Sequence, residues 1–290
     1  MTDYELGCKL PAAEWAELNR HGMFDDSSLR KYVGPFPPVA LMQNTTGLTR
    51  ESEFAAHGAD FWTALSDAVK PKPLSSFSSI LDFGCGCGRL ARMFKGYSGR
   101  LAGCDIDRRH VEWCATALDY MQTKLSSVAP PIPFSDDEFE LVISISIFTH
   151  LNEISQNQFL AELARVCQPE GLLLLTIHGE RALQRALTEP GIRSMLEVDE
   201  DKFQAAIGRF ANGEHGFILQ QGHLTTTGVD GAIGKMVSEP FEYGITFIPE
   251  SYVREHWSKW FDIVDYRVGG LHDFQDIVVL RPRKRSLGDE

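Results

Sequence analysis

Residues 80–88 bring together residue types that can hold a nucleotide-like ligand. Ile80 and Leu81 belong to an apolar run, Asp82 follows them, and glycine then recurs at positions 84, 86 and 88. Three residues without a Cβ atom within five positions allow the backbone to turn sharply and to lie directly against a ligand. Residues 89–94 have good helical propensity, so we expect the turn to present backbone N–H groups at the start of a helix.

The spacing of the glycines decides which ligand is expected. A dinucleotide-binding G-x-G-x-x-G pattern from Gly84 requires glycine at position 89, where the sequence has Arg89. The observed pattern, acid-x-G-x-G-x-G after an apolar strand, resembles motif I of the class I S-adenosylmethionine (SAM)-dependent methyltransferases. In that family the loop holds the amino-acid end of SAM, whose positive sulfonium and lack of a pyrophosphate make Asp82 compatible with it. A purely structural glycine turn is the alternative.

A second acid, Asp105, stands 21 positions after Gly84, at the end of a predicted strand over residues 100–105. A carboxylate about 20 residues past a glycine-rich turn can accept both hydroxyls of a ribose. In the resembled family the acid at this place has that role. Capping a helix is the alternative role, but Asp107 directly precedes the amphipathic run 108–121 and can cap it instead, so both functions can coexist.

Residues 131–144, PIPFSDDEFELVIS, and 147–151, IFTHL, carry the rest of the resemblance. Methyltransferases of this class have a similar acidic turn before their fourth strand, and an aromatic or histidine-containing turn after it that faces the transferred methyl group. His150 is therefore our first candidate for a general base, and His178, after the predicted fifth strand, is the second. A structural role is the alternative for both, and for His178 we favour the pocket wall. Weaker candidates are Glu153, Glu180 and His223.

The resemblance extends over roughly residues 75–180 and implies SAM as the cofactor. The residues that it places at the cofactor are Asp82, Phe83, Gly84, Cys85, Gly86, Gly88, Arg89, Asp105, Ile106, Ser127 and Ser146. One departure concerns the adenine. Many relatives bind its amino group with an acid after the third strand, but residues 125–130 contain none. Ser126, Ser127 or backbone groups would have to replace it.

Composition restricts the cellular setting and the partners. The net charge of −12 argues against a nucleic-acid partner, since the one basic cluster lies at residues 281–285. No apolar run approaches the roughly 20 residues that span a bilayer, and the acidic N-terminus is unlike a secretory signal. Six cysteines without disulfide-scaffold spacing indicate a reduced, cytoplasmic protein. A thiolate metal site at Cys85, Cys87 and Cys104 is conceivable, but small side chains in a crowded turn explain these cysteines more simply, so we expect no metal.

The order of apolar and helical runs predicts an α/β, Rossmann-like fold with a seven-stranded mixed sheet and an antiparallel seventh strand. We expect an N-terminal helical extension or cover (1–75), a SAM-binding core (76–180), an insertion or lid after the fifth strand (181–248), and the C-terminal part of the core with a tail (249–290). Insertions at the carboxyl ends of parallel strands lie over the ligand crevice, so residues 181–248 are expected to select the substrate. Tyr32, Phe36, Gln43 and Asn44 are further candidates for the acceptor pocket.

These features together predict a SAM-dependent methyltransferase that acts on oxygen or nitrogen of a small-molecule acceptor. The acceptor, the atom methylated and the oligomeric state stay open. A non-catalytic SAM-binding protein on the same fold is one alternative. An NAD-dependent oxidoreductase is another, disfavoured by the missing third glycine of its motif.

Overall fold

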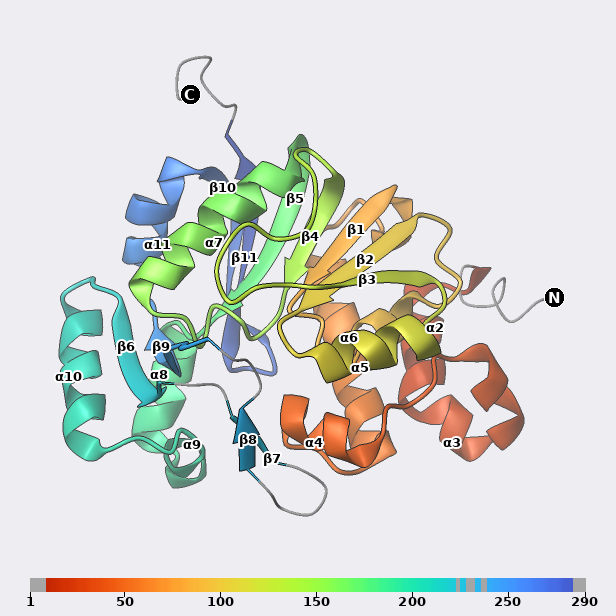
Figure 1. Cartoon of the computed structure of the whole chain (residues 1–290), viewed down its shortest axis with the longest axis horizontal. Helices are drawn as coiled ribbons and strands as arrows, with labels where there is room; N and C mark the ends of the chain where they lie inside the picture. Colours follow the sequence, from red (N-terminus) through yellow and green to blue (C-terminus); the bar gives the residue numbers. More distant parts are fainter. Residues whose placement is uncertain (1–8, 223–224, 228–232, 236–238, 284–290) are drawn as a thin grey trace. The chain divides into compact units, whose positions relative to one another are not determined.

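The computed structural model describes residues 9–222, 225–227, 233–235 and 239–283 (Figure 1). The chain forms two compact units. The first contains residues up to 127 together with 225–238, and the second contains residues 128–224 and those from 239 onwards. Among the described helices, none combines the length and hydrophobicity that crossing a bilayer requires.

The central element is one seven-stranded sheet with the order β10-β11-β5-β4-β1-β2-β3. In the first unit β1 (Ser79–Phe83), β2 (Arg100–Asp105) and β3 (Met121–Leu125) run parallel to one another. All five residues of β1 are buried, as expected for a parallel strand that is covered on both faces.

The other four strands belong to the second unit. In it β4 (Phe139–Ser144) is parallel to β5 (Cys167–Ile177), whereas β11 (Gln275–Pro282) is antiparallel to both β5 and β10 (Phe261–Leu271). The predicted mixed sheet with an antiparallel seventh strand is therefore confirmed.

The helices of the first unit lie mainly in the N-terminal extension. The described elements are α2 (Ala12–Glu17), the π-helical turn η1 (Leu18–Gly22), α3 (Met23–Asp25), η2 (Ser27–Tyr32), α4 (Val39–Thr46), α5 (Glu51–Ala68), η3 (Leu74–Ser76), η4 (Ala91–Phe94) and α6 (Arg108–Ala117). The sequence predicts a helix over residues 51–69, and α5 ends one residue earlier. Its Phe54, Phe61, Trp62 and Leu65 are buried. Their helical spacing places them on related faces, which pack into the core.

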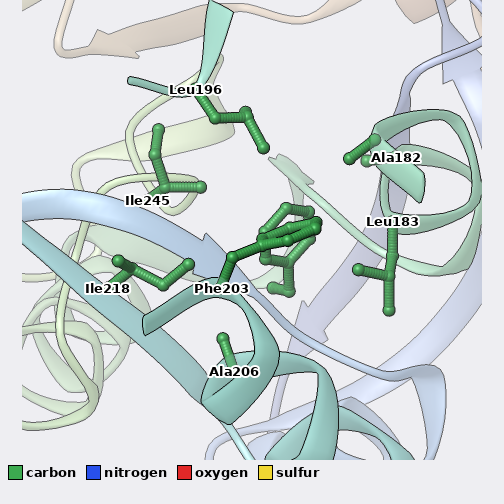
Figure 2. Packing of buried hydrophobic residues seen from close by; sticks show 9 residues of the cluster. Ala182, Leu183, Leu196, Phe203, Ala206, Ile218 and Ile245 are labelled. Atoms are coloured by element: carbon green, nitrogen blue, oxygen red, sulfur yellow. The ribbon is translucent and has the colours of Figure 1, made fainter. Parts of the chain in front are cut away.

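The described residues between β5 and β10 form helices and strands. These are α8 (Glu180–Thr188), α9 (Pro190–Met195), α10 (Glu200–Ala211), the antiparallel pair β6 (Gly216–Gln221) and β9 (Tyr243–Phe247), and then α11 (Glu250–His256) with η5 (Trp257–Lys259). Figure 2 shows their own apolar core, in which Phe203 of α10 packs among Leu183, Leu196 and Ile245. The short strands β7 (Thr225–Thr227) and β8 (Ile233–Lys235) pair with each other within the first unit. The sequence has helical spacing over residues 181–210, and its following Gly- and Thr-rich part is typical of short strands or a lid, which agrees with the order of these elements.

Four predicted boundaries are wrong. After the glycine turn there is only the four-residue 3-10 helix η4, because three left-handed glycines precede it. Helix α6 ends at Ala117 instead of 121, since Met121 starts β3. The sequence predicts a helix over residues 156–167, but α7 (Glu153–Val166) begins three residues earlier, where Asn152 caps it. Residues 169–171, Pro-Glu-Gly, predict a break before the next strand, but β5 continues through them.

Candidate functional site

The glycine turn of the first unit requires glycine for conformation and for space. Gly84, Gly86 and Gly88 have φ of 75°, 52° and 82°, a region that disfavours side chains. A Cβ at Gly86 would lie 2.5 Å from Cγ2 of Thr45, which belongs to α4. The N–H groups of Gly84 and Cys85 both donate to the Cys104 carbonyl, at 2.9 and 3.1 Å. The turn is thus fastened to the end of β2.

Asp105 ties the next strand end to the same turn. Its Oδ2 accepts the N–H of Gly86 and its Oδ1 accepts the N–H of Asp107, both at 2.8 Å. Two carboxylate oxygens offer about four acceptor positions, so about two remain for ligand hydroxyls. Asp107 is the N-cap of α6 and accepts the N–H of Arg109. The predicted division between a capping acid and a second acid at the glycine turn agrees with these contacts.

Two ionisable side chains, the carboxyl of Asp82 and the guanidinium of Arg89, lie beside the turn. The Asp82 carboxyl is buried, and its Oδ2 has no hydrogen-bond partner among the described residues. Burial, reinforced by the charge of Asp105, raises the pKa of Asp82 to about 7, and the charge of Arg89 opposes this rise. The Arg89 guanidinium lies 4.2 Å from the centre of the Phe61 ring, and burial lowers its pKa to about 10. A buried acceptor without a donor is suited to a ligand ammonium.

The other residues assigned to the cofactor in this unit occupy the strand ends as follows. Phe83 and Cys85 are buried, Ile106 is half-buried, and Ser127 is exposed directly after β3. Ser126 donates its N–H to the Asp105 carbonyl and its hydroxyl to the Ser127 carbonyl. The two serines thus lie at the place where the adenine would need replacement contacts.

The N-terminal extension makes further contacts with the elements that follow the turn, and none of them is predicted from the sequence. Thr45 Oγ1 lies 3.0 Å from Nε2 of His110, and Arg92 donates to the carbonyls of Gly34 and Pro35. The Arg92 guanidinium also lies 3.7 Å from the centre of the Phe36 ring. Phe36 packs against the buried residues Met42, Phe54 and Cys87, whereas Gln43 is exposed. No local pattern marks Thr45 or Arg92, since His110, Gly34 and Pro35 lie more than 50 positions away from them.

His150, in the second unit, follows β4. Its Nδ1 lies 2.8 Å from the Gly244 carbonyl oxygen, which can only accept, so Nδ1 carries the proton and Nε2 has the free lone pair. The ring stacks on Tyr243, with centroids 4.5 Å apart and an angle of 18°. Burial lowers the pKa of His150 to about 4, against the opposing effect of the Gly244 carbonyl. The imidazole is therefore neutral at pH 7.

His178 lies deeper in the same unit. It is 4% exposed, and its ring lies against the rings of Phe247 and Phe274, 5.7 and 5.0 Å away. Burial, reinforced by the charge of His150, lowers the pKa of His178 to about 3. Its ring centroid lies 6.4 Å from that of His150, but His178 does not itself line the cavity beside His150.

A cavity of about 470 Å³ adjoins His150. Six of its seven lining residues come from the segment 181–248, and the full set is His150, Met195, Glu197, Gln220, Gln221, Tyr243 and Ile245. Main-chain bonds fix its rim, because the Gly244 N–H donates to the His150 carbonyl at 3.3 Å. The cavity thus combines apolar and polar side chains around one neutral imidazole.

The other candidate site residues of the second unit that the structure describes make hydrogen bonds to other protein groups. Ser146 donates its N–H to Thr176 Oγ1, and its hydroxyl accepts an N–H of Gln275 at 2.9 Å. Glu153 accepts the Tyr252 hydroxyl at 2.6 Å, and Glu180 accepts the Glu250 N–H at 3.2 Å. His223 lies outside the described residues.

The described cysteines behave as small apolar residues. Cys85, Cys87, Cys104, Cys114 and Cys167 are free and buried. Burial raises the pKa of the Cys87 thiol to about 11, which leaves it protonated at pH 7. Within the described ranges, no three histidine, cysteine, aspartate or glutamate residues are arranged to hold a metal ion.

Comparisons with known proteins agree with this arrangement. Residues 81–175 match the family model described as a methyltransferase domain. This segment is therefore a SAM-dependent methyltransferase domain.

Two solved structures share the fold. The PH0226 protein from Pyrococcus horikoshii OT3 is 16% identical, with a TM-score of 0.53, over 83% of this chain and 96% of that one. The CcbJ methyltransferase from Streptomyces caelestis is 13% identical, with a TM-score of 0.50, over 78% and 90%. The methyltransferase assignment leaves no support for the oxidoreductase alternative.

Proposed function

We propose that the protein transfers the methyl group of SAM to an oxygen or nitrogen atom of a small molecule that binds in the cavity beside His150. The observation that carries this proposal is the cavity itself. Its volume of about 470 Å³ is within the usual range for small-molecule sites, and its few polar groups surround one imidazole with a free lone pair. Because the segment 181–248 supplies most of the lining, we assign acceptor selection to it.

The first unit would hold the cofactor through complementary charges. The unpartnered Oδ2 of Asp82 supports a contact with the ammonium of the amino-acid end, and Arg89 is the matching cation for its carboxylate. The remaining acceptor positions of Asp105 suit the ribose hydroxyls, and Ile106 and Ser127 lie at the strand ends where the adenine would be placed. Bound SAM supplies an electrophilic methyl group on a sulfonium. When the methyl is transferred, the neutral thioether is a good leaving group.

In the second unit His150 would accept the proton that the acceptor releases. Its bond to the Gly244 carbonyl holds the tautomer in which Nε2 is unprotonated, and stacking on Tyr243 orients the ring. A pKa of about 4 makes it a weak base, so it serves acceptors whose proton becomes acidic as the new bond forms. Burial raises the pKa of Tyr243 to about 12, so its hydroxyl stays protonated and can donate to the acceptor. His178 would support this wall from behind.

We further propose a cytoplasmic protein without a nucleic-acid partner, divided at residues 75, 180 and 248 as the sequence predicts. The free buried cysteines and the net charge of −12 support this. In this division residues 1–75 would cover the cofactor, which the contact of Thr45 with Gly86 supports.

The proposal is tested by mass spectrometry of ligand retained during purification, followed by a radiolabelled methyl-transfer assay on a panel of hydroxyl- and amine-bearing small molecules. We expect SAM or its demethylated product in the purified protein, and transfer to at least one panel member that Gln220→Ala and Gln221→Ala impair through KM. Transfer to protein or nucleic acid but to no small molecule would overturn the acceptor class. Tight SAM binding with no transfer to any acceptor would favour the non-catalytic alternative.

A further inference from the structure

The first unit contains a second cavity, of about 400 Å³. Its lining comes from α2, from the last turns of α5, from the segment 70–75 and from residues 93–97. The aromatic rings of Trp15, Trp62, Phe94 and Tyr97 form much of its wall, and Trp62 packs edge-on against Phe94 with ring centroids 4.8 Å apart. The volume is sufficient for a small organic molecule.

This cavity lies at the opposite edge of the parallel strands from the glycine turn. The lining residues Leu74 and Ser75 precede the start of β1, and Lys95 and Tyr97 precede the start of β2. The glycine turn and Asp105 come at the carboxyl ends of these two strands. Since five strand residues span about 16 Å, the cavity is separate from the groups assigned to the cofactor.

Two residues that line the cavity, Trp62 and Ser66, each have a buried polar atom, Nε1 and Oγ, without a hydrogen-bond partner among the described residues. They are one turn apart on α5 and so share one face of the helix. The neighbouring polar groups are satisfied, because Trp15 donates to the Met93 carbonyl at 2.6 Å and Tyr97 donates to the Phe77 carbonyl at 2.5 Å. An indole N–H can only donate, so a ligand at Trp62 must present an acceptor.

Charge identifies the kind of acceptor. Lys70, Lys72 and Lys95 line the cavity, and its lining contains no aspartate or glutamate, in a chain whose net charge is −12. Lys70 is paired with Asp67, and Lys95 donates to the carbonyls of Lys31 and Val33, which leave its charge in place, so the positive potential comes mainly from Lys72 and Lys95. Aromatic walls suit an apolar body, whereas this potential and two unpartnered donors suit a negatively charged end.

We propose that this cavity is a second binding site, for a small carboxylate with an apolar aryl or alkyl body. The body packs against Trp15, Trp62 and Phe94. The carboxylate accepts the Trp62 N–H and the Ser66 hydroxyl, in the positive potential of the lysines. The site is independent of methyl transfer and would be occupied with or without SAM.

The test is calorimetric titration of the full chain with 4-phenylbutyrate and with the matched neutral compound 4-phenylbutan-1-ol. We expect saturable 1:1 binding of the acid, weaker binding of the alcohol, and the same affinity when SAM is present at saturation. Trp62→Phe keeps the aromatic wall but removes the donor, and should weaken binding of the acid at least about tenfold, as loss of one charge-assisted hydrogen bond does. Ser66→Leu fills the cavity and should abolish binding of both compounds.

Trp113→Phe is the matched control, because Trp113 Nε1 is also buried and without a described partner but lies on α6, outside this cavity. It should bind the acid as the wild type does. Circular dichroism confirms that each variant is folded, and if Ser66→Leu does not fold, Trp62→Phe decides. The proposal is overturned by no binding of the acid at millimolar concentration, by equal affinity for acid and alcohol, by competition with SAM, or by equal losses in Trp62→Phe and Trp113→Phe.

Discussion

The glycine turn of the first unit and the cavity beside His150 in the second differ in how far the backbone occupies their polar side chains. At the turn, the chain's own backbone occupies one position on each oxygen of Asp105 and fixes the loop. In the cavity, the backbone occupies only Nδ1 of His150 and leaves Nε2 free. The first arrangement suits holding a ligand in one geometry, and the second suits a proton transfer, for which one atom must stay available.

Burial also acts on the two regions with opposite consequences for charge. It raises the pKa of Asp82 to about 7 and lowers that of His150 to about 4, since in both cases the neutral form is favoured where water is excluded. Neutral Asp82 is a poor partner for an ammonium, whereas neutral His150 is the form that accepts a proton. Acidification therefore weakens the first region sooner than the second.

The largest expected effect is on turnover. His150→Ala removes the proposed base and should lower kcat by about 10² to 10⁴, with nearly unchanged affinity for SAM. In the wild type, the contribution of His150 to kcat should be constant from pH 8 down to about 5 and fall through pH 4, because only the neutral ring accepts a proton. Rates and SAM titrations check both expectations.

His256→Ala is the control for this prediction. His256 is also stacked on a tyrosine, with ring centroids 4.0 Å apart, and its Nδ1 also contacts a backbone carbonyl, but it does not line the cavity. Similar kcat in His150→Ala and the wild type, or equal losses in both variants, would return His150 to a structural role and direct attention to His178.

The next effect is on cofactor affinity. Asp105→Ala releases the Gly86 N–H and removes the proposed ribose acceptor, so SAM and its demethylated product should both bind at least about tenfold more weakly. Asp107→Ala is the control, since it removes a helix cap that costs about 1 kcal/mol of stability without touching the turn. If calorimetry finds full affinity in Asp105→Ala while kcat falls, the assignment of Asp105 to the ribose is wrong.

A smaller effect separates conformation from crowding at the turn. Gly86 and Gly47 both have positive φ, but a Cβ at Gly47 meets nothing within 4 Å, whereas at Gly86 it meets Thr45. Alanine at either position should cost about 1–2 kcal/mol for the left-handed backbone, and Gly86→Ala should cost more and also weaken SAM binding. Urea unfolding and SAM titration compare the two variants. Equal unfolding midpoints and equal SAM affinities would show that Thr45 yields and that Gly86 does not face the cofactor.

The smallest effect is a pair of opposite pH slopes in unfolding free energy. The pKa of Asp82 is raised from 3.8, so its contribution to stability is present below about pH 4 and lost as pH rises through 7. The pKa of His150 is lowered from 6.5, so its contribution is present above 6.5 and lost as pH falls through 4.

Between pH 4 and 6.5, Asp82→Asn should therefore make stability rise more steeply with pH, and His150→Gln should make it rise less steeply. Each change is at most about 1.4 kcal/mol per pH unit. Urea titrations at several pH values measure how the unfolding free energy of each variant changes with pH. If both substitutions changed this slope in the same direction, the burial of one of the two groups would be contradicted.

The sequence by itself determined the parts of the protein that depend on neighbouring residues. The glycine repeat predicts the sharp turn after β1, and the position of Asp107 before an amphipathic run predicts the cap of α6, whereas the ribose role of Asp105 stays a prediction. Apolar residues predict β1 and β2, because burial on both faces leaves a continuous apolar run, but no such run marks β3. The extent of α5 likewise follows from the helical spacing of its apolar residues, because these residues are buried.

Only the tertiary structure decided which distant residues meet. Thr45 lies against Gly86, Gln275 bonds to Ser146, and the Gly244 carbonyl sets the tautomer of His150 from 94 positions away. It also placed Gln220 and Tyr243 in one cavity with His150, and left the donors of Trp62 and Ser66 without partners in another. Local patterns report the backbone conformation and burial of a segment. Contacts between distant residues depend on how the folded chain closes, which no spacing within a segment encodes.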